Sequence, residues 1–389
     1  MDCQGARKRS SCSASRASLS PRSPTSGRAV LPRFAEIRHA DTVSTVLLPT
    51  YTPALFLIAV REAVRRLRAG EVVALPTETV YGLAANALDE DAVRRIFAIK
   101  GRPAHNPVIV HVASLAQARE CASSWPPMAD VLAAAFWPGP LTVIVPRSHR
   151  IPDAVTAGGD TVAIRWPQHP FMQAVIRECG FPLAAPSANL SNQLSPTGAH
   201  HVQGQLGDVL GCIVDGGQCQ VGIESTVVDI TGERPHVLRP GMISEAAIRA
   251  VVKSDKTADG SGSQRISRGP VRSPGMLQRH YSPKATLRVL TWKDEADLAQ
   301  QLLAVTDPAG GSMDSSFSDL QVLAHSVIPL GGRFPNISVI PHDAEAFARA
   351  LYGELHRCDE AGARWIIVEA PPATPEWAGI VDRLRRAAA

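Results

Sequence analysis

Two clusters of polar side chains interrupt apolar stretches of this 389-residue sequence. The segment Pro76-Thr-Glu-Thr-Val-Tyr-Gly-Leu83 places hydroxyls, a carboxylate and a phenol directly after a short apolar run. Such groups at a strand end can hold a ligand, or they can simply form a turn. The segment Lys100-Gly-Arg-Pro-Ala-His-Asn106 brings two cations and an amide together. Because Lys supplies a point charge and Arg a planar fork, this cluster could bind phosphate, or it could only compensate a helix dipole.

Other charged or titratable side chains lie inside apolar runs. Arg165 ends the run Thr161-Val-Ala-Ile-Arg165, where a charge that enters a core must be paired. A structural partner such as Glu224 would satisfy it, and a bound carboxylate would suit the guanidinium equally well. His111 lies within Val108-Ile-Val-His-Val112, where a histidine is more often a satisfied core residue than a ligand.

Small hydroxyls and one further arginine follow several later apolar runs, in Ala185-Pro-Ser-Ala-Asn189, Ser195-Pro-Thr197, Gly222-Ile-Glu-Ser-Thr226 and Arg239-Pro-Gly241. The sequence contains no GxxxxGK[ST], no GxGxxG that opens a helix, and no HExxH. It also lacks the spacing of a metal-ligand set. A nucleotide would therefore have to be held by separate side chains and strand-end amides.

The elements that position these residues follow an α/β pattern. Leu55, Ile58 and Val64 recur at helical spacing, and Asp89 and Gly101 are typical of the start and end of another helix. Strands are predicted at 71–75, 108–112, 141–145, 162–166, 183–185, 209–214 and 226–230, with helices around 129–136 and 171–179. Residues 54–252 are therefore interpreted as one mixed α/β domain.

A second, smaller domain is predicted after a linker. Residues 253–285 are rich in Ser, Gly and basic side chains, which is typical of a linker. Residues 286–389 alternate predicted strands at 287–290, 322–324, 337–340 and 365–368 with helices at 295–305, 344–356 and 377–388. This alternation favours a small, Rossmann-like open parallel sheet.

Composition limits the remaining possibilities. Residues 1–53 are rich in Ser and Arg and poor in acids, which is typical of a disordered tail, a start-site artefact or an organelle transit peptide. A net charge of +4, from 40 basic and 36 acidic residues, is too small to indicate nucleic-acid binding by itself. Seven cysteines without a CxxC pair indicate reduced thiols and a cytoplasmic location, and no apolar run has the roughly 20 residues of a membrane span.

Taken in order, these segments resemble the threonylcarbamoyl-AMP synthase family, whose core is the YrdC-like domain. The resemblance covers about residues 54–252. Its further motifs are Trp137-Pro-Gly-Pro-Leu-Thr142, Asp215-Gly-Gly217, Glu224-Ser-Thr226 and Leu238-Arg-Pro-Gly241. Ser273-Pro-Gly-Met276 and Arg279-His-Tyr-Ser-Pro283 resemble the linker of the longer, two-domain members, in which Ser282 replaces the usual Ala. The C-terminal domain matches only loosely.

The resemblance implies that L-threonine, bicarbonate and ATP give threonylcarbamoyl-AMP and pyrophosphate, for modification of the adenosine beside the anticodon of certain tRNAs. It implies Mg²⁺ with the ATP, held by phosphate oxygens and water and not by protein side chains. It also implies partners in downstream tRNA threonylcarbamoyl-transferase proteins, with tRNA or double-stranded RNA as a further ligand, and no membrane.

The family's functional residues carry over by position. The catalytic signature falls on Lys100, Arg102, Ser187 and Asn189. The ATP contacts fall on Arg102, Asn106, Thr161, Ser187, Ser195 and Arg239, with His280 or Tyr281 closing over the nucleotide from the linker. The threonine pocket falls on Thr79, His111, Arg165, Ala185 (through its backbone) and Ser225.

Two other functions stay open at this stage. The basic residues Lys100, Arg102 and Arg239 would also suit an RNA-binding module without turnover, whose affinity would fall steeply with salt. A carbamoyl-adenylate enzyme of the hydrogenase-maturation type is disfavoured because no acylphosphatase-like or zinc-finger segment precedes the domain. The group that accepts the proton of the threonine amine is also open among a substrate phosphate, bicarbonate and His111.

Overall fold

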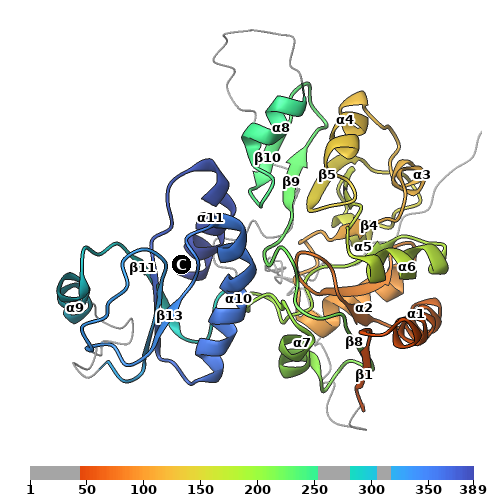
Figure 1. Cartoon of the computed structure of the whole chain (residues 1–389). Helices are drawn as coiled ribbons and strands as arrows, with labels where there is room; N and C mark the ends of the chain where they lie inside the picture. The colour runs from red at the N-terminus through yellow and green to blue at the C-terminus, as the bar shows by residue number, and fades with distance from the viewer. Residues whose placement is uncertain (1–43, 253–280, 305–316) are drawn as a thin grey trace, which may run out of the picture. The chain divides into compact units, whose positions relative to one another are not determined.

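The structure is a computed structural model that describes residues 44–252, 281–304 and 317–389 (Figure 1). Its strands form two sheets, one of ten strands and one of four. The order in the large sheet is β1-β8-β2-β3-β7-β4-β6-β5-β9-β10, and the order in the small sheet is β11-β14-β12-β13. A mixed-sheet domain followed by a smaller α/β domain is the architecture that the sequence predicts.

The large sheet combines parallel and antiparallel pairs. Its strands are β1 (Val46–Pro49), β2 (Val73–Leu75), β3 (Gly82–Asn86), β4 (Ile109–His111), β5 (Leu141–Pro146), β6 (Thr161–Arg165), β7 (Leu183–Ala184), β8 (Cys212–Asp215), β9 (Thr226–Asp229) and β10 (His236–Arg239). The helices of this domain are α1 (Pro53–Arg68), α2 (Glu90–Lys100), α3 (Leu115–Glu120), α4 (Pro127–Phe136), α5 (Asp153–Thr156), α6 (Pro170–Cys179), α7 (Ala199–Leu206) and α8 (Glu245–Val251).

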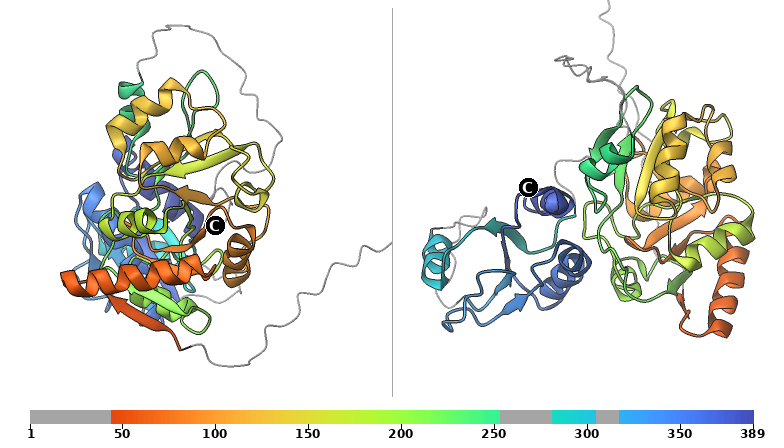
Figure 2. Two further views of the ribbon diagram at one scale, coloured as in Figure 1. Left: turned by 90° about the vertical axis from the view of Figure 1, so that its right-hand side faces the viewer. Right: turned by 45° about the horizontal axis from the view of Figure 1, so that its top comes forward.

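Local sequence explains where the first long helices begin and end. The Thr52 hydroxyl accepts the Leu55 amide at the start of α1, and Pro53 occupies the first helical position. Asp89 caps α2 in the same way, and Gly101 ends it with a φ of +58°, a conformation that suits glycine. Helices α1 and α6 pack against each other (Figure 2). Their facing side chains belong to one buried apolar cluster.

The C-terminal domain is a small parallel sheet with helices. It contains β11 (Thr286–Leu290), β12 (Leu320–Ala324), β13 (Ile337–Val339) and β14 (Trp365–Glu369), together with α9 (Glu295–Leu303), α10 (Ala344–Glu360), the short 3₁₀ helix Pro375–Trp377 and α11 (Ala378–Ala387). All three strand pairs of this sheet are parallel. The open parallel sheet predicted from alternating strand and helix patterns is confirmed.

The register of the large sheet brings chemistry-bearing residues side by side. Strands β4 and β6 run parallel with His111 opposite Arg165, and β5 runs antiparallel to β6 with Thr142 opposite the same arginine. The Arg165 guanidinium and the His111 imidazole therefore lie at the carboxyl ends of two neighbouring strands. Within the described ranges, no helix combines the length and apolar character that crossing a bilayer requires.

The structure contains strands that the sequence prediction leaves out, namely β1, β3 and β10. Packed structure begins before residue 54, because β1 pairs in parallel with β8 and places Val46 opposite Cys212. This strand escapes notice because it is short and lies next to a segment of tail-like composition. Strand β3, Gly-Leu-Ala-Ala-Asn, lacks the β-branched residues that mark strands and forms through its antiparallel neighbours β2 and β7.

Candidate functional site

A small, polar cavity of about 50 Å³ lies where β4, β6 and β9 meet the loops after β2 and β7. Its lining is rich in hydroxyls and arginines and includes one histidine and one carboxylate. The lining residues are Thr77, Thr79, Val80, Gly82, Arg102, Ile109, His111, Arg165, Ala185, Pro186, Ser187, Glu224, Ser225, Arg239 and Tyr281. These come from widely separated segments that the sheet register collects at one place.

Arg165 is held rigidly at one side of this cavity. Its Nη2 forms an ion pair of 2.7 Å with Glu78, its Nη1 donates to the Thr79 hydroxyl at 2.8 Å, and its Nε donates to the Gly139 carbonyl at 3.4 Å. Burial opposes ionisation of Glu78, but the attraction of Arg165 outweighs it and lowers the carboxyl pKa. The sequence-based suggestion of Glu224 as the partner is therefore wrong, because Glu78 comes from the loop that directly faces the arginine.

His111 faces the cavity as a neutral imidazole. Burial and the neighbouring charge of Arg165 lower its pKa to about 3. Its Nδ1 is buried and has no hydrogen-bond partner among the described residues. A buried polar atom without a partner costs free energy, so this nitrogen is available to a bound ligand. A group with this pKa is too weak a base to accept much proton at neutral pH.

Ser225 and Arg239 form another part of the lining. The Arg239 guanidinium donates to the Ser225 carbonyl from Nε at 3.1 Å and from Nη2 at 3.0 Å, and Nη2 also reaches the Ser225 hydroxyl at 3.1 Å. That hydroxyl is in turn 2.7 Å from the Thr142 hydroxyl. Burial is the largest influence on Arg239 and lowers its pKa. The side chain thus places a positive charge in a desolvated position.

Lys100 and Asn189 act beneath the cavity and do not line it. The Lys100 ammonium donates to the carbonyls of Ser187 and Asn189, and the Asn189 amide donates to the carbonyls of Leu190 and Gln193 at 2.8 Å. Burial lowers the pKa of Lys100 far below its ordinary value. These contacts hold the loop that carries Ser187. Lys100 therefore positions a residue of the lining without lining the cavity itself.

Arg102 enters the cavity from the loop after α2. Its Nε and Nη2 donate to the carbonyls of Asn106 and Pro107, at 3.1 and 2.8 Å, and burial lowers its pKa to about 10. Arg102 therefore remains a cation at neutral pH. The Asn106 side-chain oxygen is buried without a hydrogen-bond partner among the described residues.

The structure brings most of the predicted site residues together. All five residues predicted for threonine line the cavity, namely Thr79, His111, Arg165, Ala185 and Ser225. Four of the residues predicted for the nucleotide do so, namely Arg102, Ser187, Arg239 and Tyr281. Lys100, Asn106, Thr161, Asn189 and Ser195 are not part of the lining, and His280 lies outside the described residues.

Sequence reasoning missed three residues that hold the site. Glu78 belongs to the motif Pro76–Leu83, and it is the buried counter-ion of Arg165. Tyr352 and Arg383 come from the C-terminal domain, and both contact Glu224. Arg383 interrupts the apolar spacing of Ile380, Leu384 and Ala387 on α11, and a charge at such a core position is the signal that would have found it.

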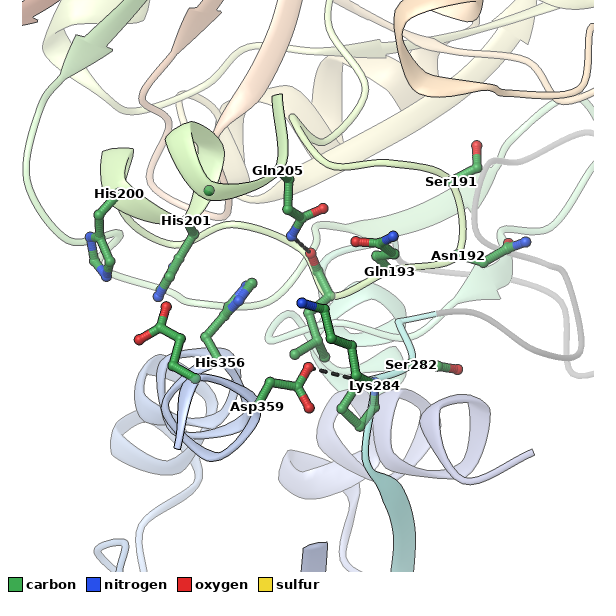
Figure 3. A pocket seen from close by; sticks show the side chains of 14 residues that line it. Ser191, Asn192, Gln193, His200, His201, Gln205, Ser282, Lys284, His356 and Asp359 are labelled. Carbon is green, nitrogen blue, oxygen red and sulfur yellow. Dashed lines mark hydrogen bonds between the residues drawn. The ribbon is translucent and has the colours of Figure 1, made fainter. Parts of the chain in front are cut away.

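A second cavity, of about 550 Å³, lies between the loop at 191–194 and α7 on one side and residues 282–284 and α10 on the other (Figure 3). His201 of α7 and His356 of α10 point toward one another there and stack at 3.8 Å between ring centroids. The His201 Nδ1 accepts the Thr197 amide at 3.2 Å, and the His356 Nε2 lies 3.1 Å from the Ser195 carbonyl. This stack therefore depends on neutral imidazoles.

We expect the His201 site to make the protein less stable in mild acid. Burial and the neighbouring histidines lower its pKa to about 3, whereas the unfolded chain takes up the proton near pH 6.5. Between these values the unfolded state binds more protons, so stability falls as pH decreases, by about 1.4 kcal/mol per unit for this residue. Thermal or urea denaturation at pH 7.5 and 5.5 should show a smaller acid loss in His201→Gln than in the wild type. His149→Gln, at an exposed position, serves as the control and should match the wild type; an equal acid loss in all three would contradict the expectation.

Comparison with known proteins identifies relatives of both domains. A family model described as "Telomere recombination" (Sua5, YciO and YrdC) matches residues 65–241, and one described as "Threonylcarbamoyl-AMP synthase, C-terminal domain" matches residues 243–389. The threonylcarbamoyl-AMP synthase of Pyrococcus abyssi is 39% identical over 333 residues, which cover 84% of this chain and 93% of that protein. The Bacillus subtilis enzyme of the same name is 40% identical, with 85% and 92% covered.

A solved structure agrees over the same extent. The crystal structure of P. abyssi Sua5 complexed with L-threonine matches with a TM-score of 0.74 and 35% identity, covering 88% of this chain and 98% of that one. The match spans both domains, which a likeness of the catalytic domain alone would not produce. The chain therefore belongs to the threonylcarbamoyl-AMP synthase family.

Proposed function

We propose that this protein condenses L-threonine, bicarbonate and ATP into threonylcarbamoyl-AMP and pyrophosphate, as a nucleotidyltransferase that supplies the modification of tRNA adenosine 37. The observation that carries the proposal is the buried cavity whose lining contains three arginines, Arg102, Arg165 and Arg239. Arginine side chains suit both an amino-acid carboxylate and the phosphates of a nucleotide. The names of the relatives and the threonine in the P. abyssi structure support the same reaction.

Threonine would bind on the Arg165 side. The arginine geometry is set by Glu78 and Thr79, so its guanidinium can receive a carboxylate without rearranging. The unpartnered Nδ1 of His111 would take a hydrogen bond from the substrate. The threonine amine must be neutral to attack, and the low pKa of His111 leaves a substrate phosphate or bicarbonate as the better proton acceptor.

The nucleotide would bind at Arg102 and Arg239. Arg102 and Arg239 are cations in a desolvated setting, where they stabilise charge that grows on the phosphates more strongly than they would in water. The Ser187 loop is prearranged by Lys100 and Asn189. Positioning and charge stabilisation together can supply most of the catalysis in a transfer of this kind.

Mg²⁺ would accompany the triphosphate as part of the substrate. Both carboxylates near the cavity are already paired, Glu78 with Arg165 and Glu224 with Arg383. No group of three or more His, Cys, Asp or Glu side chains able to hold a metal occurs in the part of the chain that the structure describes. Phosphate oxygens and water suit this cation, so the protein residues need not coordinate it.

We propose that Tyr281 opens and closes the site. The cavity holds about 50 Å³, whereas ligand sites usually enclose roughly 300–1,000 Å³, so nucleotide entry requires a movement. Tyr281, the first described residue after the gap, lines the cavity and is almost fully buried. Its φ of +62° is a strained value for a tyrosine, which is typical of functional segments. Displacement of this side chain would open the cavity.

Pyrophosphate release from ATP tests the reaction. The purified protein should release pyrophosphate only when both L-threonine and bicarbonate are present, and mass spectrometry should detect threonylcarbamoyl-AMP. Carbamoyl phosphate in place of threonine should give no turnover, which separates this activity from the hydrogenase-maturation type. No release under any condition, together with RNA binding that weakens steeply with salt, would refute the proposal in favour of a binding module.

The downstream partners would be the proteins that transfer the threonylcarbamoyl group to tRNA, because the adenylate is a reactive mixed anhydride that must be consumed. We place this chemistry in the cytoplasm. The five described cysteines, Cys121, Cys179, Cys212, Cys219 and Cys358, are free and buried, which is consistent with a reducing compartment.

A further inference from the structure

The C-terminal domain contributes a fully buried arginine beside the candidate site. Arg383 lies on α11 among Ile380, Leu384 and Ala387, and its side chain is 0% exposed. Taking a guanidinium out of water is costly unless every donor is satisfied. A charge retained at such a position therefore requires an explanation from its contacts.

The contacts of Arg383 converge on the Glu224 segment. Its Nε donates to the Glu224 carboxylate at 2.7 Å and its Nη2 donates to the Glu224 carbonyl at 3.1 Å. Its Nη1 donates to the Pro240 carbonyl and to the Asp382 carboxylate, each at 2.9 Å. The guanidinium carbon also lies 5.3 Å from the ring centroid of Tyr281, which is a cation–π distance.

These partners border the nucleotide side of the cavity. Glu224 and Tyr281 line it, and Pro240 directly follows the lining residue Arg239. The other Glu224 oxygen accepts the Ser195 hydroxyl at 2.5 Å, so the position of Ser195 also depends on this carboxylate. One side chain thus fixes three separate segments of the site.

Arg383 also affects the charge of Glu224. Burial opposes ionisation of Glu224, but Arg383 and Arg239 outweigh it and lower the carboxyl pKa. Without Arg383, a carboxylate would remain in a cavity that must accept a polyphosphate, and like charges repel. Glu224 would then neutralise part of the positive charge of Arg239, and Arg239 would attract the ligand less strongly.

We propose that Arg383 is a positioning residue that the C-terminal domain supplies to the catalytic site, where it orders Glu224, Ser195 and Tyr281 for the nucleotide. The proposal rests on the proposed function for the identity of the ligand. With this role the C-terminal domain takes a direct part in ATP use. In the described structure, the single side chain that contacts Glu224, Pro240 and Tyr281 together is Arg383, which belongs to that domain.

The test compares Arg383→Met and Arg383→Lys with Arg385→Ala in the full chain. Arg385 lies on the same helix with a side chain 72% exposed and contacts only Asp382 among the described residues, so its replacement controls for loss of a charge. Steady-state pyrophosphate release should show a KM for ATP raised at least tenfold in Arg383→Met, with the KM for threonine within threefold of wild type. Arg383→Lys keeps the positive charge but loses the planar guanidinium, so its KM for ATP should lie between those of the wild type and Arg383→Met.

Stability and function are separated by a further variant. Arg383→Met leaves the Glu224 charge unpaired, so Glu224→Gln is added to remove that charge. The single variant Glu224→Gln is the reference, because Glu224 itself lines the cavity. If Arg383 only stabilised the fold, the double variant would match Glu224→Gln in both its melting temperature and its KM for ATP. A positioning role predicts a melting temperature equal to that of Glu224→Gln together with a higher KM for ATP.

The outcomes are distinct. If the wild type releases no pyrophosphate, the proposed function fails, and equilibrium binding of ATP to the same variants still tests the arginine. If the wild type turns over, the folded Arg383→Lys protein keeps the wild-type KM for ATP, and the double variant keeps the KM of Glu224→Gln, the positioning role is refuted.

Discussion

Replacing Arg165 by alanine is expected to raise the KM for threonine about a hundredfold while changing the KM for ATP less than threefold. Removing one partner of a buried, hydrogen-bonded charge pair costs about 3 kcal/mol, and each 1.4 kcal/mol is a factor of ten. The arginine is held by Glu78 and Thr79, whereas Arg102 and Arg239 are held by other residues. Titration of each substrate in the pyrophosphate assay measures both constants.

The same substitution leaves the Glu78 carboxylate buried without its counter-ion. Arg165→Ala should therefore also lower the melting temperature, and the double variant Glu78→Gln with Arg165→Ala should recover part of that loss without recovering threonine affinity. A folded variant with unchanged KM for threonine would refute the assignment of the carboxylate site.

Replacing Lys100 by methionine is expected to reduce kcat/KM for ATP by about two orders of magnitude. Methionine keeps the apolar stem and removes the ammonium, so the carbonyls of Ser187 and Asn189 lose a shared donor inside the protein. A buried carbonyl without a partner costs about 1–3 kcal/mol, and two are affected. The Ser187 loop should then lose its fixed geometry.

Arg94→Ala provides the matched control, because Arg94 lies on the same helix with its side chain 64% exposed. Its activity should equal that of the wild type. Lys100→Met should weaken ATP binding even though the lysine does not line the cavity, and normal ATP kinetics in a folded Lys100→Met protein would show that the loop does not need this anchor.

Much of the fold follows from local sequence signals. Helix α2 is bounded by Asp89 and Gly101 as predicted, and the strands around His111 and Arg165 are marked by runs of β-branched residues. Strand β3 carries no such signal, because its conformation is set by the neighbours with which it pairs. Tertiary pairing, which a local pattern does not contain, determined this element.

The site shows the same division. Motifs identified which residues gather, and the cavity contains every residue predicted for threonine. The motifs do not distinguish residues that line the cavity from residues that hold the lining in place, because this depends on where a long side chain ends. Lys100 reaches backbone carbonyls beneath the cavity, and the partner of Glu224 comes from a helix 159 positions later in the chain. Such distant pairs are defined only by the folded structure.

The separation between Glu224 and Arg383 has a consequence for synthesis of the protein on the ribosome. At about 5–20 residues per second, Glu224 is made roughly 8–30 s before Arg383. During this interval the Glu224 carboxylate lacks its ion pair with Arg383, and Val80, Leu194 and Ile223 lack the apolar residues of the C-terminal domain that cover them in the finished protein. This part of the catalytic domain is therefore completed only when the last helix of the chain has been made.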